Sequence, residues 1–579
     1  MTKSTCNCTV HPVAKAHVGD AVTDSTTIEP ASHASQRNKG EHADLLVVGS
    51  ISTGNPGAPT AEAMAVAGGE IIAIGALADV ENLTNSSTQT IRPDGTIIPG
   101  LVDPHMHIWT SLLNLNWIDL SHQNCPTFDD AVMTIKNAAA KSKSGEYVLG
   151  KLFDPSLYPG ETPLTRAILD QAAPDNPVLV MNASGHFIYA NSAAFTAAGV
   201  DDQTQDPPGG TFGRVDGKLN GAVGEPAAML MVIAPLPKPT PQEIAAGIDA
   251  ILVAAASRGV TSVREAATGA IAGIGELALL HQLNGAKRLP TRVSTAQFAV
   301  VSGRTPAQVA ADWKAAGVTP FSGDEMVRAD AWKVVTDGSN QGRSGYFMQP
   351  YLGEDFGGRA DWTPESLRDV LSVGLDDGWQ LMVHTNGDGA IEFALTALEE
   401  LLPVKGGTDL RHRLEHVSFS TDDQLARMAK IGLSPSFLMN HVYFWGAAFR
   451  DTILGPERAN RLDRVASAYA AGLRPSLHSD YNVTDIHPLL SARTAVQRVL
   501  NADGTVLNPA ECATAAQALT AITTNAAWQI HADDRGSLEV GKRADFAIAS
   551  ADPWSTDPST WADITFTETY IDGTPAWQS

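Results

Sequence analysis

The sequence predicts an α/β protein built on a (β/α)8 TIM-type barrel, and three features of the chain lead to that prediction. From about residue 245 onward, helices of roughly 10 to 15 residues alternate with short apolar strands, as they do in βα units around a parallel sheet. Eight such strands can be counted, which is the number that closes this barrel. Both ends of the chain are β-rich instead, so we expect them to flank the barrel.

The expected barrel strands are apolar runs bounded by turn and helix-stop residues. Thr363 followed by Pro364 is typical of a helix N-cap with proline in the first turn, and Gly378, Gly432 and Gly472 are typical of helix C-termini. These signals separate the helices from the strands. The strands are expected at 259–266, 291–300, 329–338, 379–387, 412–417, 432–439 and 472–480, with a first strand that ends in "PHMH" at 104–107.

The other segments complete the expected organisation. Residues 1–42 are rich in Ser, Thr, Ala and His without periodicity, so we expect a flexible N-terminal arm. Residues 43–98 and 535–579 are predicted to pair as one small β-sandwich-like domain built from both chain ends. Residues 99–534 hold the barrel, with a large inserted subdomain at about 112–240, after the first barrel strand.

Composition narrows the class of protein. The 579 residues are 43% hydrophobic and 18% charged, and no apolar run reaches the roughly 18 residues of a membrane span. A formal net charge of −24 argues against a nucleic-acid or anionic-membrane surface, which needs clustered Lys and Arg. Four cysteines are too few for a disulfide scaffold, and the opening "MTKSTCNC" lacks the apolar core of a secretory signal. We expect a cytoplasmic protein with a small-molecule substrate, without nucleic-acid or membrane partners, and assembled as a homodimer.

The N-terminal arm contains four residues of metal-ligating type, Cys6, Cys8, His11 and His17. Their spacing does not match a usual zinc framework. A plain N-terminal extension is therefore favoured over a metal site in the arm.

His105 and His107 lie two residues apart at the end of the first expected barrel strand. Side chains at that spacing point to the same face of a strand, which in a barrel is the interior near its mouth. Two imidazoles on one face can share a divalent ion. The alternative, two buried histidines satisfied by hydrogen bonds, is less favoured for a pair at this position.

Other strand ends repeat this pattern. His384 ends "QLMVH", His416 ends "RLEH" and Asp480 ends "SLHSD". Lys333 lies within "AWKVV", where an uncompensated ammonium is costly to bury. A lysine with a depressed pKa can react with carbon dioxide to give a carbamate, an anionic ligand that can bridge two metals. The alternative is an ion pair between Lys333 and Asp337 or a neighbouring carboxylate.

These residues at the mouth of a barrel point to metal-assisted hydrolysis. Metal ions lower the pKa of bound water toward neutrality and so produce a hydroxide nucleophile. A carboxylate beside that water can take its proton and deliver it to the leaving group, and Asp480 is the candidate for this role. The expected chemistry is hydrolysis at a polarised carbonyl or an amidine-like carbon.

Six motifs in order along the chain resemble the amidohydrolase superfamily, and within it the YtcJ-like branch of metal-dependent hydrolases that includes N-substituted formamide deformylases. The resemblance covers about residues 43 to 575 and is more specific for the superfamily than for a substrate. The motifs are "IIPGLVDPHMH", "WKVVTDGSNQGRSG", "VHTNGDGAIEFAL", "RLEHVSFSTDDQLARM", "HSDYNVTDIHPL" and "GSLEVGKRADFAI".

The resemblance implies roles for the strand-end residues. It implies that His105 and His107 bind the more buried ion and that a carbon dioxide-derived carbamate on Lys333 bridges to a second ion. His384 and His416 then bind the second ion, while Asp480 contacts metal and acts as the proton shuttle. The expected cofactor is one or two divalent ions per chain, with zinc favoured and manganese, iron or nickel as alternatives.

Six further residues are candidate substrate contacts, each with a structural alternative. The segment "GHFIYANSAAF" resembles the branch's substrate lid, so its histidine and asparagine are lid candidates, or parts of a structural loop. The histidine and tryptophan of "NHVYFWG" line the pocket or only pack. The arginine of "DGSNQGRSG" binds a substrate carbonyl or carboxylate, or pairs with an acidic residue on the surface. The glutamate that ends the second strand modulates a metal ligand or forms a buried ion pair. These residues are His186, Asn191, His441, Trp445, Arg343 and Glu265.

The leading functional prediction is a metal-dependent amidohydrolase that cleaves a non-peptide C–N bond, in an amide such as an N-substituted formamide or an N-acyl amine. A hydrolase of a carbamate, cyclic amide or lactone on the same scaffold is the first alternative, because a fold does not determine a reaction. A non-catalytic assembly protein is a remote alternative. It predicts missing ligands, whereas every expected ligand position holds a competent residue.

Overall fold

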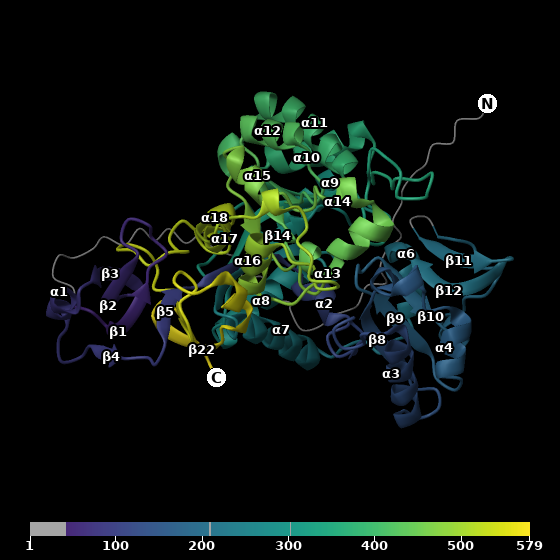
Figure 1. Ribbon diagram of the computed structural model, residues 1–579, viewed down its shortest axis with the longest axis horizontal. Helices are drawn as coiled ribbons and strands as arrows, with labels where there is room; N and C mark the ends of the chain where they lie inside the picture. Colours follow the sequence, from purple (N-terminus) through teal and green to yellow (C-terminus); the bar gives the residue numbers. More distant parts are fainter. Residues whose placement is uncertain (1–41, 208–209, 302) are drawn as a thin grey trace.

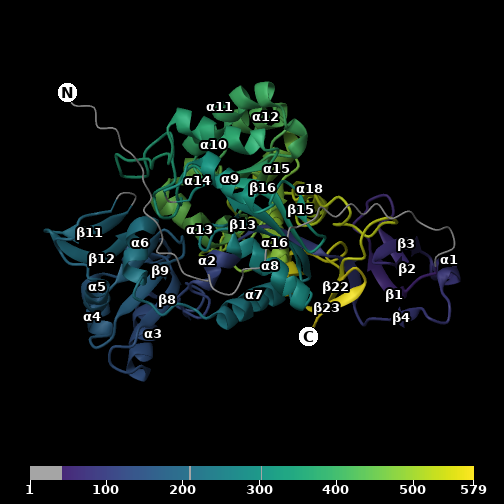
Figure 2. The same cartoon turned by 180° about the vertical axis from the view of Figure 1, so that it is seen from behind.

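A computed structural model describes residues 42–207, 210–301 and 303–579 of the chain. Figures 1 and 2 show three parts in a row: a β-domain coloured purple and yellow, a central barrel, and a blue subdomain with its own sheet. Residues 1–41 lie outside the described residues. The expected flexible arm, with Cys6, Cys8, His11 and His17, therefore stays a prediction.

The central part is the predicted (β/α)8 barrel. Eight strands pair in parallel in the order β20-β19-β18-β17-β16-β14-β13-β6. A short ninth strand, β15 (Ser322–Gly323), pairs antiparallel with β16. The strands are β6 (Leu101–Met106), β13 (Val260–Thr268), β14 (Arg292–Phe298), β16 (Val327–Val335), β17 (Gln380–Thr385), β18 (Arg413–His416), β19 (Ser434–Phe437) and β20 (Ser476–Leu477).

Two backbone hydrogen bonds join the segment that follows the last barrel strand to the end of the first. The N–H of Asp480 donates to the carbonyl of His105 at 3.1 Å, and the N–H of His107 donates to the carbonyl of Tyr481 at 2.7 Å. The expected strand 472–480 is shorter in the structure, because the chain leaves the sheet after Leu477 and turns toward β6. This turn brings Asp480 beside the two histidines.

Helices surround the barrel and alternate with its strands. The predicted cap is confirmed at α10, where the Thr363 hydroxyl accepts a hydrogen bond from the N–H of Ser366 and Pro364 begins the helix. The barrel helices are α7 (Pro241–Ala256), α8 (Gly275–Ala286), α9 (Pro306–Ala315), α10 (Pro364–Asp376), α11 (Asp388–Lys405), α12 (Asp422–Lys430), α13 (Asn440–Ala448), α14 (Pro456–Ala459), α15 (Val465–Ala470), α16 (Pro488–Gln497), α17 (Ala515–Ala521) and α18 (Thr524–Gln529). Among the described residues, none of the helices combines the length and the apolar character that crossing a membrane requires.

The segment between β6 and β13 forms a separate six-stranded sheet with its own helices and its own apolar core. Its strand order is β11-β12-β10-β9-β8-β7. The strands are β7 (Ile118–Asp119), β8 (Val148–Phe153), β9 (Val178–Asn182), β10 (Phe187–Ala190), β11 (Thr211–Val215) and β12 (Lys218–Gly224). The helices are α3 (Phe128–Lys141), α4 (Arg166–Ala172), α5 (Ser192–Ala198) and α6 (Glu225–Ile233). The short helix α2 (Ile108–Leu112) packs instead on β13 and α7 of the barrel.

The two chain ends build one β-domain. Its eight strands form a continuous sheet in which β5 from the N-terminal side pairs with β21 from the C-terminal side, with Pro99 opposite Phe546. The strands are β1 (Leu45–Ser52), β2 (Thr60–Ala67), β3 (Glu70–Gly75), β4 (Gln89–Ile91), β5 (Thr96–Pro99), β21 (Phe546–Ala549), β22 (Phe566–Ile571) and β23 (Thr574–Gln578), with α1 (Leu77–Val80) beside them.

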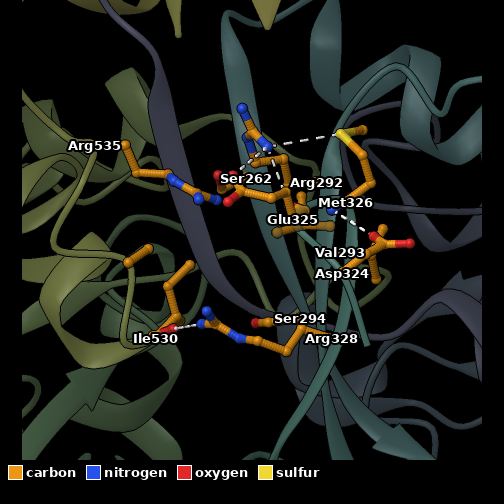
Figure 3. A pocket seen from close by; sticks show the side chains of 12 residues that line it. Ser262, Arg292, Val293, Ser294, Asp324, Glu325, Met326, Arg328, Ile530 and Arg535 are labelled. Atoms are coloured by element: carbon orange, nitrogen blue, oxygen red, sulfur yellow. Dashed lines mark hydrogen bonds and ion pairs between the residues drawn. The ribbon is translucent and has the colours of Figure 1, made fainter. Parts of the chain in front are cut away.

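A small cavity lies at the N-terminal ends of β13, β14 and β16, against the segment 530–535 (Figure 3). Three arginines line it, and each forms an ion pair with a carboxylate. Residues at this end of a barrel serve stability, since catalytic groups come from the opposite end. The pairs are Arg292 with Asp545, Arg328 with Asp330, and Arg535 with Asp534.

Candidate metal centre

The six predicted ligands come from the C-terminal halves or ends of five barrel strands. His105 lies in β6, Lys333 in β16, His384 in β17 and His416 in β18, while Asp480 follows β20. Parallel strands all end at the same mouth, so their last residues meet there although they lie far apart in the sequence.

Asp480 brings the first two histidines to one point. Its Oδ1 atom lies 3.3 Å from Nε2 of His105 and 3.2 Å from Nε2 of His107. Ligand atoms about 2.1 Å from a tetrahedral ion are separated by roughly 3.4 Å, so these three atoms have the spacing of a shared ion. This Oδ1 is buried and has no hydrogen-bond partner within the part of the chain that the structure describes. A cation bound between the three atoms would supply the partner that Oδ1 of Asp480 lacks. The residues therefore fit a divalent metal.

A second pair of ring nitrogens lies beside the first group. Nε2 of His416 is 2.9 Å from Nδ1 of His384, and Nδ1 of His416 is 3.9 Å from Oδ2 of Asp480. Burial, and then neighbouring positive groups, hold the pKa of both histidines well below the ordinary value. Both imidazoles are therefore neutral at neutral pH, the form that binds metal.

Lys333 reaches the same centre from β16. Its Nζ lies 3.4 Å from Nε2 of His105, and burial lowers its pKa to about 8. Within the described residues no carboxylate lies at ion-pair distance from this nitrogen. The carboxylate of Asp337 instead accepts hydrogen bonds from the backbone N–H groups of Tyr346, Asn386 and Gly387. The alternative pairing of Lys333 with Asp337 is thus not the arrangement found.

Glu415 is a site residue that the sequence reasoning missed. Its Oε2 accepts a hydrogen bond from Nδ1 of His105 at 2.7 Å, and Arg413 binds both of its oxygens. Burial opposes ionisation, but Arg413 and His105 hold the pKa of Glu415 far below its usual range. A carboxylate on Nδ1 fixes the tautomer that leaves Nε2 free for a ligand. The available signal was an Arg and a Glu at alternate positions of a buried strand, "RLEH".

His478 is the second residue that was missed. Its ring stacks on that of His105, with centroids 4.5 Å apart and planes 13° from parallel. Both of its ring nitrogens are buried without a hydrogen-bond partner in the described residues, and burial holds its pKa well below the ordinary value. The signal for it was its position two residues before Asp480 in "HSD".

Two of the weaker candidates lie near the proposed ligands. Glu265 accepts backbone hydrogen bonds from Ile108 and Trp109, and its Oε1 lies 4.0 Å from Nδ1 of His107. His441 is buried near Asp480, whose charge partly opposes the effect of burial, and its pKa is lowered to about 4.

The other four weaker candidates lie in packing or polar contacts. Trp445 donates from Nε1 to Asp154 of the inserted subdomain at 2.9 Å. The side chain of Asn191 caps α5 and is fully used inside that subdomain. Nη1 of Arg343 forms an ion pair with Glu354 at 2.8 Å. Nδ1 of His186 lies 3.1 Å from Oε2 of Glu225 in the same subdomain.

The family model described as "Amidohydrolase family" matches residues 94–576. The chain belongs to the amidohydrolase family. It is a member of the YtcJ-like branch and a hydrolase of the amidohydrolase type. The scaffold predicted from the sequence is therefore confirmed, together with its family.

Curated relatives match this amidohydrolase over most of their length. An N-substituted formamide deformylase from Arthrobacter pascens is 26% identical over 92% of this chain and 97% of its own. The putative amidohydrolase YtcJ of Bacillus subtilis is 27% identical over 85% and 91%, and the protein LONG AFTER FAR-RED 3 of Arabidopsis thaliana is 29% identical over 88% of each chain.

A solved structure supports the fold. An uncharacterized metal-dependent hydrolase from Pyrococcus horikoshii has a TM-score of 0.69 at 21% identity, and the match covers 89% of this chain and 99% of that one.

Proposed function

We propose that this amidohydrolase cleaves the amide bond of a small N-substituted formamide or N-acyl amine at a centre of zinc ions. The observation that carries the proposal is the spacing of 3.2 and 3.3 Å between Oδ1 of Asp480 and the Nε2 atoms of His107 and His105. The amide substrate is supported by the similarity to a formamide deformylase over nearly the whole of both chains.

The proposed ligands are His105, His107, Lys333 as its carbamate, His384, His416 and Asp480. A bound divalent ion lowers the pKa of a water molecule and polarises the substrate carbonyl. The carbamate is favoured by burial of Lys333, because a pKa of about 8 leaves part of the amine unprotonated and reactive at neutral pH. His441, Glu265 and Arg343 remain proposed groups around the substrate.

Asp480 is the proposed proton shuttle. Its carboxylate is held at the centre by the backbone bond to His105, and nearby histidines keep its pKa well below the ordinary value although burial acts in the other direction. As an acceptor it takes a proton from the attacking water. As the C–N bond breaks, it passes a proton toward the products.

The test combines an analysis of bound metal with assays on a panel of substrates. The substrates carry the same substituent and differ only in the bond that is cleaved. Active protein is expected to hold at least one divalent ion per chain and to hydrolyse the N-formyl and N-acetyl amides faster than the matching carbamate, cyclic amide or lactone. Activity with less than one ion per chain overturns the metal role. Turnover of the carbamate or the lactone without turnover of any amide overturns the amide substrate.

A further inference from the structure

Asp480 lies in a tight turn that begins soon after the last barrel strand. The N–H of Val483 donates to the carbonyl of Asp480 at 2.7 Å and closes the turn. Asp480 itself has a φ of 50°. This left-handed conformation is unfavourable for a residue with a Cβ atom, and it persists only where the surrounding structure imposes it. Contacts of the neighbouring residues must therefore hold Asp480 in place.

Ser479, the residue before Asp480, supplies such contacts. Its N–H donates to Oδ1 of Asp103 at 3.2 Å, and its hydroxyl donates to Oδ2 of the same carboxylate. The hydroxyl oxygen also accepts a hydrogen bond from the N–H of Tyr481 at 3.1 Å. The carbonyl of Ser479 accepts a hydrogen bond from the hydroxyl of Thr484 at 2.6 Å. Bonds to Ser479 thus fix the backbone on both sides of Asp480.

Asp103 is the fixed point of this arrangement. It lies in β6, two residues before His105, and only 1% of it is exposed. In the part of the chain that the structure describes, its hydrogen bonds come from Ser479 and, at 3.5 Å, from the N–H of His105, and no cationic side chain lies at ion-pair distance. A buried carboxylate without a cationic partner is costly, so an apolar residue would stabilise the strand better. The carboxylate is explained by the serine that it holds.

The turn determines where the carboxylate of Asp480 lies. Its Oδ1 is 3.3 Å from Nε2 of His105 and 3.2 Å from Nε2 of His107. Distances between a metal ion and its ligands vary by only about 0.2 Å, so a small shift of the turn would take this oxygen out of the shared position. The fit of the three atoms to one ion therefore depends on how firmly the turn is held.

We propose that Asp103 and Ser479 are positioning residues, which hold Asp480 in its left-handed turn and direct its Oδ1 toward His105 and His107. The role rests on the proposed function, in which Asp480 is a metal ligand and the proton shuttle. Asp103 and Ser479 act through the backbone of the turn. Their effect on the metal centre is exerted by the carboxylate of Asp480.

Two substitutions of Ser479 separate its hydroxyl from its bulk. Ser479→Ala removes the bonds of the hydroxyl to Asp103 and Tyr481, whereas Ser479→Thr retains a hydroxyl on the same carbon. Competition with a fluorescent chelator measures zinc binding to the full-length chain. The affinity is expected to fall about 10- to 100-fold in Ser479→Ala and less than about 3-fold in Ser479→Thr. An equal loss in both variants contradicts the role of the hydroxyl.

Ser467 offers a matched control, because it makes the same pair of contacts outside the metal centre. Its N–H donates to Oε2 of Glu511 at 3.1 Å, and its hydroxyl donates to Oε1 of the same residue. Ser467→Ala is expected to lower the stability of the chain in urea as Ser479→Ala does, while its zinc affinity stays near wild type. Equal losses of zinc affinity in the two alanine variants show a general structural effect and refute the positioning role.

A double-mutant cycle shows whether Ser479 acts through Asp480. In the Asp480→Ala background, Ser479→Ala is expected to change the zinc affinity less than about 2-fold, because the carboxylate that the serine positions is already absent. A further loss of about 10-fold or more in this background shows that the serine acts on the centre by another route, and it overturns the proposal.

The zinc titrations also keep the two proposals apart. Wild-type zinc affinity in a folded Ser479→Ala refutes the positioning role and leaves the proposed function intact. A wild-type chain that binds no zinc refutes the proposed metal centre, and the positioning role with it. The titration of the wild-type chain alone distinguishes these two failures.

Discussion

Nδ1 of His105 and Oε2 of Glu415 lie 2.7 Å apart although 310 residues separate them in the chain. The bond joins the first barrel strand to the sixth and leaves Nε2 of His105 directed at Asp480. The carboxylate therefore orients His105, a candidate metal ligand, through this hydrogen bond.

Glu415→Gln is expected to weaken zinc binding about 10- to 100-fold, because the histidine loses the charged acceptor that fixes its tautomer and raises its basicity. Competition with a fluorescent chelator measures the affinity. Thermal unfolding is followed in parallel, since the change also removes the partner of the buried Arg413. Glu399→Gln, a glutamate of helix α11, is the control. Wild-type zinc affinity in a folded Glu415→Gln contradicts the orienting role.

Carboxylation of Lys333 predicts a covalent carbon dioxide adduct. Protein equilibrated with ¹³C-bicarbonate is expected to give a carbamate carbonyl signal in the NMR spectrum that is missing from Lys333→Met. Raising the pH from 7 to 9 through the pKa of about 8 increases the fraction of unprotonated amine and is expected to speed adduct formation in metal-free protein. The same signal in both proteins excludes this lysine as its origin.

The barrel and the position of the candidate ligands at its mouth were predictable because both depend on local patterns. Apolar strands alternating with capped helices indicate βα units, and parallel strands of a barrel end at one mouth. A histidine or lysine at a strand end is thus placed near the others without knowledge of any contact. This reasoning located His105, His384 and His416 at the mouth.

The contacts across the barrel were not predictable in this way. Glu415 could hydrogen-bond to His105 or pair with Arg413 alone. Which of these occurs depends on the distance between two strands that are far apart in the sequence. Likewise the pattern of the inserted segment indicates a subdomain, but its docking through Asp154 and Trp445 depends on how two folded units meet. Side-chain direction after chain turns, as at Asp480, is equally a tertiary property.

The number of ions is tested by removing one ligand group at a time. If two sites exist, His105→Ala is expected to bind less zinc than the wild type. Its kcat is expected to fall about 10³-fold, because several kcal/mol of transition-state stabilisation is lost. His384→Ala is expected to keep about one ion per chain. Mass spectrometry of the metal content measures both, with His281→Asn as a control on helix α8. A wild-type content of one ion that His384→Ala does not change shows that a single site is present.

The buried pair of Arg292 and Asp545 predicts how stability depends on pH at the junction of the barrel and the β-domain. Nε of Arg292 lies 2.7 Å from Oδ2 of Asp545, and Arg292 overcomes the effect of burial to lower the pKa of this carboxyl to about 2. Because the folded-state pKa lies below the unfolded value, the stabilisation is complete above about pH 4 and is lost as the pH falls toward 2. The shift corresponds to roughly 2 kcal/mol.

Asp545→Asn is therefore expected to lower the free energy of unfolding at pH 7 by about 2 to 4 kcal/mol, since it also leaves Arg292 less well paired. Urea unfolding at pH 7 and at pH 3 measures the difference between variant and wild type, which should shrink at the lower pH as the wild-type carboxyl gains its proton. Asp312→Asn, at an exposed position on helix α9, is the control and should change stability by less than about 0.5 kcal/mol. A difference that stays constant between the two pH values would show that the charge of Asp545 contributes nothing to holding the junction.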